Sequence, residues 1–532
     1  MSRGFDGGGA DESSPPPDDA ALGKGELQDR AVRGVTWTVI NVAVALPVGF
    51  LVNLVVARVL GVVDYGRLAY LTVVMDVVSG IVMMGATPAL VQFGSKAHAA
   101  GRRDEVAALM SKVQGFRVLV AAPVLTVVVL LLVSDVDPWF KLIAVVFGVL
   151  LPAALDGAPA GLAIENKTAA GAKVVLVSSL LTQAAVLGAV LVVARADVVW
   201  AVRLIMLSVT VLLALVPLAP AYRRAVLRPR LPSGLPAGFW PFALPAGAAA
   251  LVSNLVVSRT EVVALTWLSD ATSVGVFALA FGLAGHLFAP AQAVVGPLVP
   301  AISGLREVDV AAVAAAFGRT VRATSTVVAL LTGVGLPVVT LLVPAFYGAS
   351  FEGVPPVLLA LGVANGFLIV GGPVAAFVMA RLSGSRVLLA SLVALAVDVA
   401  LAVGLIPFWG AWGAVVANVS AAATQMLVLL VAELRALGLS WGVVLRDAVP
   451  ALVGAVVAVG AWLAGRPISS VLLAAIVAGL IGLAAVVLLL GVLRSGLTDG
   501  DLRGIVRVLP GRLQTGAGAA LRWVRWRPEV QG

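Results

Sequence analysis

Ionisable side chains are rare in the apolar stretch between residues 35 and 493, and each exception needs a chemical explanation. Five of them lie within long apolar runs: Asp76, Arg259, Glu261, His286 and Asp398. An ionisable group deep in a bilayer costs on the order of 3 kcal/mol on insertion scales, so it needs a partner or a water-filled cavity. Such groups often mark substrate pathways or ion sites in membrane proteins.

Arginine suits an anionic substrate, because its charge persists at low dielectric and its planar fork gives bidentate contacts to phosphate. Arg259 lies in the outer half of the predicted helix 238–268, and Arg58 ends the predicted helix 34–60. We predict that Arg259 supplies positive charge to a central cavity and that Arg58 contributes near its outer mouth. Two structural alternatives stay open: Arg259 can form an interhelical salt bridge, and Arg58 can reach the membrane interface or pair with Asp64.

Three further residues are candidates for lining the same cavity: Asn254, His286 and Glu261. Asn254 and His286 can instead hydrogen-bond a neighbouring helix, as polar residues in membrane helices often do. Glu261 is two residues from Arg259, so their side chains point to different faces of the helix and need separate partners.

Asp76 and Asp398 are the candidates for ion coupling. They lie near the middle of the predicted helices 67–95 and 386–407. A carboxylate at this depth can bind a proton or a sodium ion, but paired structural carboxylates fit the same pattern. The chain has no Cys and two His residues, which excludes thiolate ligands and a histidine cluster, so we predict neither a metal nor a cofactor.

The elements that must position these residues are membrane helices. The chain has 532 residues, of which 61% are hydrophobic, and its mean hydropathy is +1.08. Apolar runs of about twenty residues recur along it, as membrane-spanning helices require. We predict an all-α integral membrane protein with about fourteen transmembrane helices. The short loops leave no room for an extramembrane catalytic domain, so we do not expect an enzyme.

The predicted helices fall into two six-helix lobes followed by a C-terminal pair. The predicted parts are a disordered cytoplasmic arm (1–30), an N-lobe (31–222), a linker (223–237), a C-lobe (238–436), a helix pair (437–493) and a basic tail (494–532). Most Lys and Arg residues fall in the tail and in the loops on the side of the N-terminus. This bias predicts that both termini are cytoplasmic. Basic residues dispersed in this way do not indicate nucleic-acid binding.

The two lobes also echo each other in sequence. Residues 53–58 read Asn-Leu-Val-Val-Ala-Arg, and residues 254–259 read Asn-Leu-Val-Val-Ser-Arg. Each is followed by a glycine-led helix start, at Gly66 and at Gly275. Six helices per unit predict repeats of parallel topology around a central cavity.

Four segments resemble motifs of Wzx-type oligosaccharide flippases. Residues 58–66 resemble the "R-x-L-G-x-x-x-Y-G" junction of that family, and residues 85–90 resemble its "G-x-x-x-A-L" element. Residues 270–278 are similar to its "V-G-x-Y-A-L" segment, with Phe277 in place of Tyr, and residues 406–414 to its "I-P-x-x-G-x-x-G-A" turn. The order and spacing resemble the polysaccharide-flippase branch of the multidrug/oligosaccharidyl-lipid/polysaccharide (MOP) superfamily, and the fourteen helices resemble its MurJ branch.

The resemblance implies two lobes packed as a V and alternating access between the two sides of the membrane. It implies export of a polyprenyl pyrophosphate-linked oligosaccharide from the inner to the outer leaflet of a bacterial inner (plasma) membrane, for cell-envelope polysaccharide synthesis. The implied partners are this lipid-linked oligosaccharide, membrane lipids, and glycosyltransferases or a polymerase of the same pathway.

Two other functions stay open on the sequence. A multidrug or cation antiporter of the same superfamily would use Asp76 or Asp398 as its coupling site. An inactive scaffold in an envelope-synthesis complex would recruit partners through the N-terminal arm and the basic tail. A membrane glycosyltransferase or polymerase fits less well, because such enzymes need a large outer loop.

Overall fold

The computed structural model describes residues 24–83, 85–245, 247–248, 260–293, 310–379, 384–493 and 495–496. Within these ranges every regular element is helical, which confirms the predicted all-α membrane protein. Twelve stretches there are long and apolar enough to cross a membrane. One of them, Ala43–Gly80, is kinked at Gly61, and the segment 239–268 is described only in part. The count of fourteen therefore stays a prediction.

The N-terminal bundle comprises the helices up to residue 227, with two π-helical turns between them. Its elements are α1 (Lys24–Met83), α2 (Ala86–Ala99), α3 (Arg103–Phe116), η1 (Arg117–Ala121), α4 (Ala122–Leu132), α5 (Pro138–Ile143), η2 (Ala144–Leu150), α6 (Leu151–Leu155), α7 (Gly157–Ile164), α8 (Thr168–Val192), α9 (Ala196–Ala214) and α10 (Pro220–Leu227).

The described part of the C-terminal bundle begins at residue 260. Its elements are α12 (Thr260–Leu268), α13 (Ala271–Ala293), α15 (Val310–Leu330), η3 (Leu331–Gly335), α16 (Leu336–Tyr347), η4 (Ala349–Phe351), α17 (Val354–Val370), α18 (Gly372–Met379), α19 (Gly384–Trp409), α20 (Ala411–Leu437), α21 (Trp441–Gly465) and α22 (Val471–Val492). The predicted domain boundaries are not tested by this division and stay predictions.

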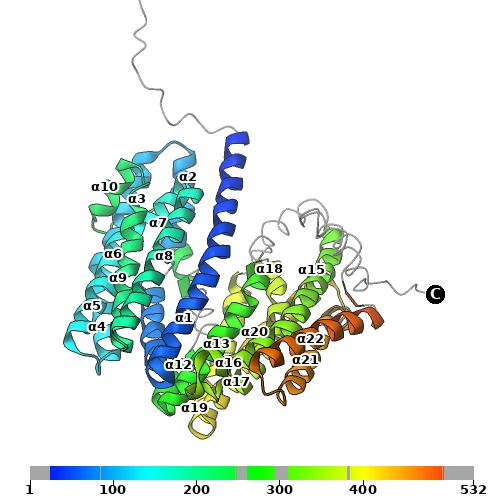
Figure 1. The fold of residues 1–532 in the computed structure, drawn as a ribbon. Helices are drawn as coiled ribbons and strands as arrows, with labels where there is room; N and C mark the ends of the chain where they lie inside the picture. Colours follow the sequence, from blue (N-terminus) through cyan, green and yellow to red (C-terminus); the bar gives the residue numbers. More distant parts are fainter. Residues whose placement is uncertain are drawn as a thin grey trace, which may run out of the picture.

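The two bundles converge at one end and diverge at the other, as Figure 1 shows. At the convergent end one hydrophobic core contains residues of both bundles, among them Leu68 of α1 and Phe277 of α13. Towards the N-terminus of α1 the cores are separate, since one holds only N-terminal residues up to Ala243 and the other only residues from Phe288 onwards. The molecule is therefore a V that is closed at the end opposite the N-terminus.

A glycine pair closes the convergent end. A Cβ added at Gly66 would lie 2.8 Å from the backbone nitrogen of Gly275, and one added at Gly275 would collide with the carbonyl oxygen of Val62. Only residues without a side chain allow helices α1 and α13 to approach this closely. The two glycines are the pair that the sequence echo placed at equivalent positions of the two predicted lobes.

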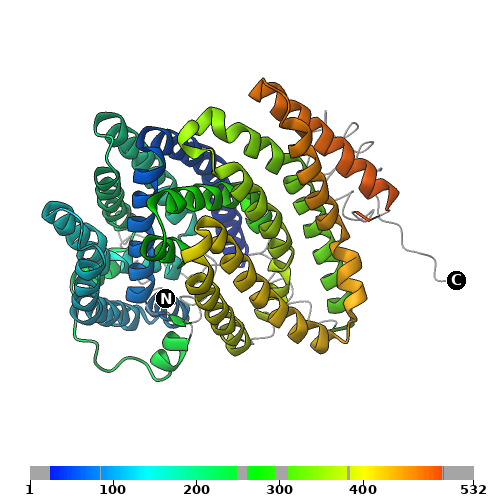
Figure 2. The same ribbon diagram turned by 90° about the horizontal axis from the view of Figure 1, so that it is seen from below.

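Helices α21 and α22 pack on the outside of the C-terminal bundle. Figure 2 shows them (orange) at the edge of the molecule away from the N-terminal bundle. Gly454 of α21 lies against the backbone of Ala329 in α15, and Gly482 of α22 lies against the carbonyl of Gly333. Small residues at these crossings let the helices pack backbone to backbone.

Arg58 does not pair with Asp64, one of the alternatives that the sequence left open. The Arg58 guanidinium donates hydrogen bonds to the carbonyls of Ala345 and Phe346 (3.0 and 2.9 Å). These carbonyls end α16, where the helix leaves its last carbonyls without intrahelical partners. Arg58 therefore joins the two bundles at the convergent end.

Candidate functional site

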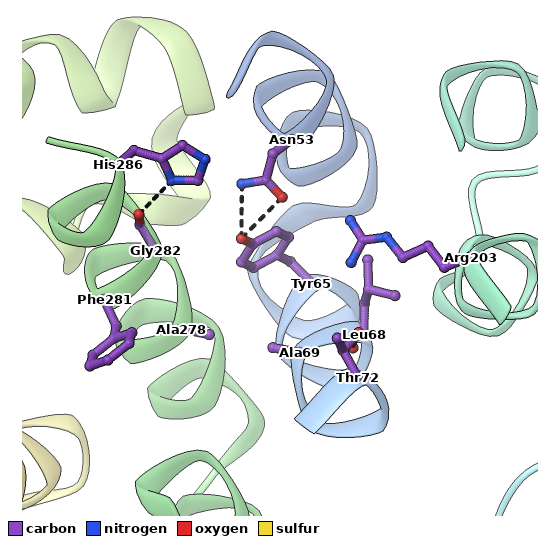
Figure 3. Close-up of a pocket in the computed structure, with 10 residues that line it drawn as sticks. All are labelled: Asn53, Tyr65, Leu68, Ala69, Thr72, Arg203, Ala278, Phe281, Gly282 and His286. Atoms are coloured by element: carbon purple, nitrogen blue, oxygen red, sulfur yellow. Dashed lines mark hydrogen bonds between the residues drawn. The ribbon is translucent and has the colours of Figure 1, made fainter. Parts of the chain in front are cut away.

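A small polar pocket lies between the two bundles. It has a volume of about 110 Å³ and is lined by α1, α9 and α13. Figure 3 shows its polar side chains, which are Asn53, Tyr65, Thr72, Arg203 and His286. Polar groups in a membrane helix cluster where water or a substrate replaces lipid, so this interbundle pocket is the candidate functional site.

The kink in α1 builds one side of the pocket. Gly61 has φ 71° and ψ 176°, a backbone conformation that favours glycine, and it reverses the direction of the chain. The reversal brings Asn53 on the first leg of α1 beside Tyr65 on the second leg. The Asn53 amide donates to the Tyr65 hydroxyl at 3.1 Å. This bond fixes the two polar groups relative to each other across the kink.

His286 of α13 forms the opposite wall. Its Nδ1 lies 2.7 Å from the carbonyl oxygen of Gly282, which can only accept, so Nδ1 carries a proton. In the neutral imidazole Nε2 is then the acceptor. His286 also borders a separate apolar groove of about 320 Å³ between α1 and α13, which includes Pro47, Phe50 and Pro290. A polar pocket and an apolar groove thus meet at one residue.

A second polar cluster is buried in the C-terminal bundle. Glu261 of α12, Asp398 of α19 and Asn418 of α20 are 0%, 0% and 3% exposed. The Asn418 amide donates to Oε1 of Glu261 at 2.7 Å. The carboxyl groups of Glu261 and Asp398 are close enough to interact electrostatically, and neither oxygen of Asp398 has a hydrogen-bond partner among the described residues. Two adjacent buried carboxyl groups cannot both carry an uncompensated charge, so this cluster can hold a proton or a cation.

Solved structures of transporters share this architecture. The chain aligns with the lipid II flippase MurJ in an inward-closed conformation with a TM-score of 0.64 and 12% identity, over 84% of this chain and 97% of MurJ. It aligns with an inward-facing multidrug resistance MATE transporter of the MOP superfamily with a TM-score of 0.53 and 15% identity, over 75% of this chain and 99% of that one. It aligns with a MATE protein in the bent conformation with a TM-score of 0.50 and 14% identity, over 78% of this chain and 99% of that one.

The chain shares the fold of these solved structures. No protein-family model matches the sequence, and no curated protein matches it. At such low identity the alignments establish the fold alone. The more specific resemblance to Wzx-type flippases stays a prediction.

On this fold the predicted site residues do not form a single site. His286 lines the interbundle pocket, whereas Glu261 lies with Asp398 in the buried carboxyl cluster. Arg58 lies at the convergent end and does not line the pocket. Arg259 and Asn254 lie outside the described residues, so their predicted roles stay predictions.

Asp76 lies on the pocket side of α1. It is four residues beyond Thr72, and residues four apart occupy one face of a helix. Thr72 lines the pocket, and Asp76 is exposed one turn closer to the divergent end of the V. The two carboxylates predicted for ion coupling are therefore in different bundles, and Asp398 is the buried one.

Four polar residues of the pocket were not among the candidates from the sequence: Asn53, Tyr65, Thr72 and Arg203. Arg203 is the charged one. It stands on α9, and its guanidinium approaches the second leg of α1 near Leu68 and Thr72 (Figure 3). The sequence feature that could have identified Arg203 is that it is the only charged residue in the predicted helix 198–221. A charged side chain in an apolar helix needs an anion or a wet cavity.

Proposed function

We propose that the protein is a transporter, not an enzyme, and that it moves a polyprenyl pyrophosphate-linked oligosaccharide from the inner to the outer leaflet by alternating access. The single observation behind this proposal is the polar pocket that adjoins an apolar groove at His286. Such a substrate has a hydrated anionic head and a hydrocarbon tail. It therefore needs a polar and an apolar surface side by side.

Charge at the pocket supports an anionic head group. Arg203 supplies a guanidinium, which binds phosphate through two parallel hydrogen bonds. The membrane potential assists the proposed direction, since moving one negative charge outward gains about 2.3 kcal/mol per 100 mV. Export then requires no ion gradient on energetic grounds.

The shape of the molecule fits the first step of such a cycle. With the predicted cytoplasmic termini, the divergent end of the V faces the cytoplasm and the convergent end faces outward. The substrate would load between α1 and α13 from the inner leaflet. Release would require separation of the contacts at Gly66, Gly275 and Arg58.

The structural similarities are compatible with this proposal and with the antiporter. The protein with the TM-score of 0.64 is named a lipid II flippase, and the other two aligned proteins are MATE proteins. A lipid II flippase and the proposed protein would both handle a lipid-linked substrate.

A multidrug or cation antiporter is the second candidate, because the buried Glu261–Asp398 pair suits a proton or cation. In an antiporter this pair would couple ion entry to substrate exit. A flippase can use the same pair to drive its return step, so the pair alone does not separate the two functions.

Proteoliposomes separate them directly. The purified protein is reconstituted with fluorescent undecaprenyl pyrophosphate-linked oligosaccharide, and an impermeant reductant bleaches the outer leaflet. We expect protein-dependent loss of the protected inner-leaflet fluorescence. Ethidium transport driven by a proton or sodium gradient, without flipping, would establish the antiporter. If the protein shows neither flipping nor ethidium transport, the scaffold function is the one that remains.

A further inference from the structure

A second apolar groove lies on the C-terminal bundle, separate from the interbundle pocket. It has a volume of about 660 Å³ and is formed by α17, α20 and α21, with almost no polar atoms on its surface. Its floor includes the small residues Ala360, Ala364 and Ala423, and Trp412 and Trp462 stand at one end. It shares no residue with the pocket of Figure 3.

The dimensions of this groove match one lipid leaflet. On α17 its lining runs from Pro356 to Leu368, and on α20 from Trp412 to Met426. At 1.5 Å per residue these stretches are about 18 and 21 Å long. Half of a hydrocarbon core is about 15 Å thick. The groove is thus long enough for one acyl chain lying along the bundle.

The end of the groove carries the groups that recognise a lipid head. Trp412 and Trp462 are placed where α20 begins and α21 ends, as interfacial tryptophans are in membrane proteins. The Arg466 guanidinium lies 4.9 Å from the centre of the Trp462 ring. Arg466 is exposed, and it forms no ion pair with a carboxylate of the described residues. The Arg466 cation therefore lies one helical turn beyond the apolar lining, where the phosphate of a lipid in the groove would lie.

We propose that this groove binds one anionic phospholipid, with an acyl chain along α17 and the phosphate on Arg466. In the predicted orientation the lipid belongs to the outer leaflet. The bound chain fills the space between α20 and α21 and so joins the terminal helix pair to the rest of the bundle. This inference does not depend on the transported substrate.

Native mass spectrometry of the delipidated full-length protein in detergent tests the site. The probes are phosphatidylglycerol and phosphatidylcholine with identical acyl chains. We expect one tightly bound phosphatidylglycerol and at least about tenfold weaker binding after Arg466→Gln, equivalent to about 1.4 kcal/mol. Ala364→Phe, which fills the groove, should weaken the binding of both lipids.

Arg195→Gln is the matched control. Arg195 is also exposed and lies 5.9 Å from the Phe140 ring, but it forms ion pairs with Asp137 (3.3 Å) and Asp197 (3.5 Å). Its replacement should leave lipid binding unchanged. Equal binding of the two lipids by the unmodified protein, equal effects of both Gln variants, or a dimer that excludes lipid from the groove would each overturn the proposal.

Discussion

Arg203 is the residue on which the anion-binding role of the pocket depends. We expect Arg203→Ala to lower the flipping rate at least about tenfold, because a charge-assisted hydrogen bond contributes about 1.5–3 kcal/mol. Arg203→Lys keeps the charge but loses the fork, so its rate should be intermediate. The proteoliposome assay measures both, at equal protein levels. Arg224→Ala, on the exposed face of α10, is the control and should flip normally.

The Glu261–Asp398 pair is tested by its response to ions. If the pair holds a proton or a sodium ion, then lowering the pH or adding sodium should raise the melting temperature of the protein, since a ligand bound only by the folded state stabilises it. Asp398→Asn removes one carboxylate while keeping its size. We expect this variant to lose the response, and an unchanged response would exclude the pair as the site.

Glu261 and Asp398 could each be recognised from the sequence, but their contact could not be predicted. Glu261 and Asp398 each stood out as acidic groups in apolar runs, yet their contact depends on how α12 packs against α19. Arg67 is similar: its partners are Asp135 (2.7 Å), in the turn after α4, and Asp197 (2.9 Å), in the first turn of α9. Such long-range pairs follow from helix packing, which a single sequence does not specify.

At the scale of elements, the crossing of α1 and α13 controls the convergent end. Gly275→Leu would place a side chain against the backbone of Val62 and push the bundles apart there. We expect a longer distance between spin labels at Ser134 and Glu352, measured by electron paramagnetic resonance. We also expect a lower flipping rate, because the outer end could no longer close.

Gly285→Ala provides the comparison on the same helix. A Cβ at Gly285 meets no atom within 4 Å, so this change should alter neither the distance nor the rate. An unchanged distance in Gly275→Leu would show that the glycine pair does not hold the bundles together. The sequence echo pointed to Gly66 and Gly275, but only the packing shows that they meet.

At the scale of the whole molecule, hydropathy was sufficient for the fold class. Apolar runs with short connections predict membrane helices, and the repeated motifs predict two bundles. The V and a central cavity were expected from the family resemblance and from the two predicted lobes. Which end of the V is closed could not be predicted, because it depends on which contacts between the bundles form at each end. The residues that line the pocket could not be predicted either, since they come from three helices far apart in sequence.

Orientation in the membrane is tested by single cysteines in this cysteine-free chain. An impermeant thiol reagent added to intact cells should label cysteines at Ser134 and Ser350. It should not label cysteines at Arg102 and Arg228. All four positions are exposed, so accessibility alone does not bias the comparison. The reverse pattern would place the divergent end outside and reverse the proposed direction of loading.

The most direct test of the account asks whether substrate passes through the interbundle pocket. Thr72 lines that pocket, so a single cysteine at this position can be modified with a charged thiol reagent in proteoliposomes. We predict that Thr72→Cys flips the lipid-linked oligosaccharide before modification and loses this activity afterwards, whereas Val192→Cys, on the exposed end of α8, keeps it. Flipping at an undiminished rate by fully modified Thr72→Cys protein would contradict the central claim.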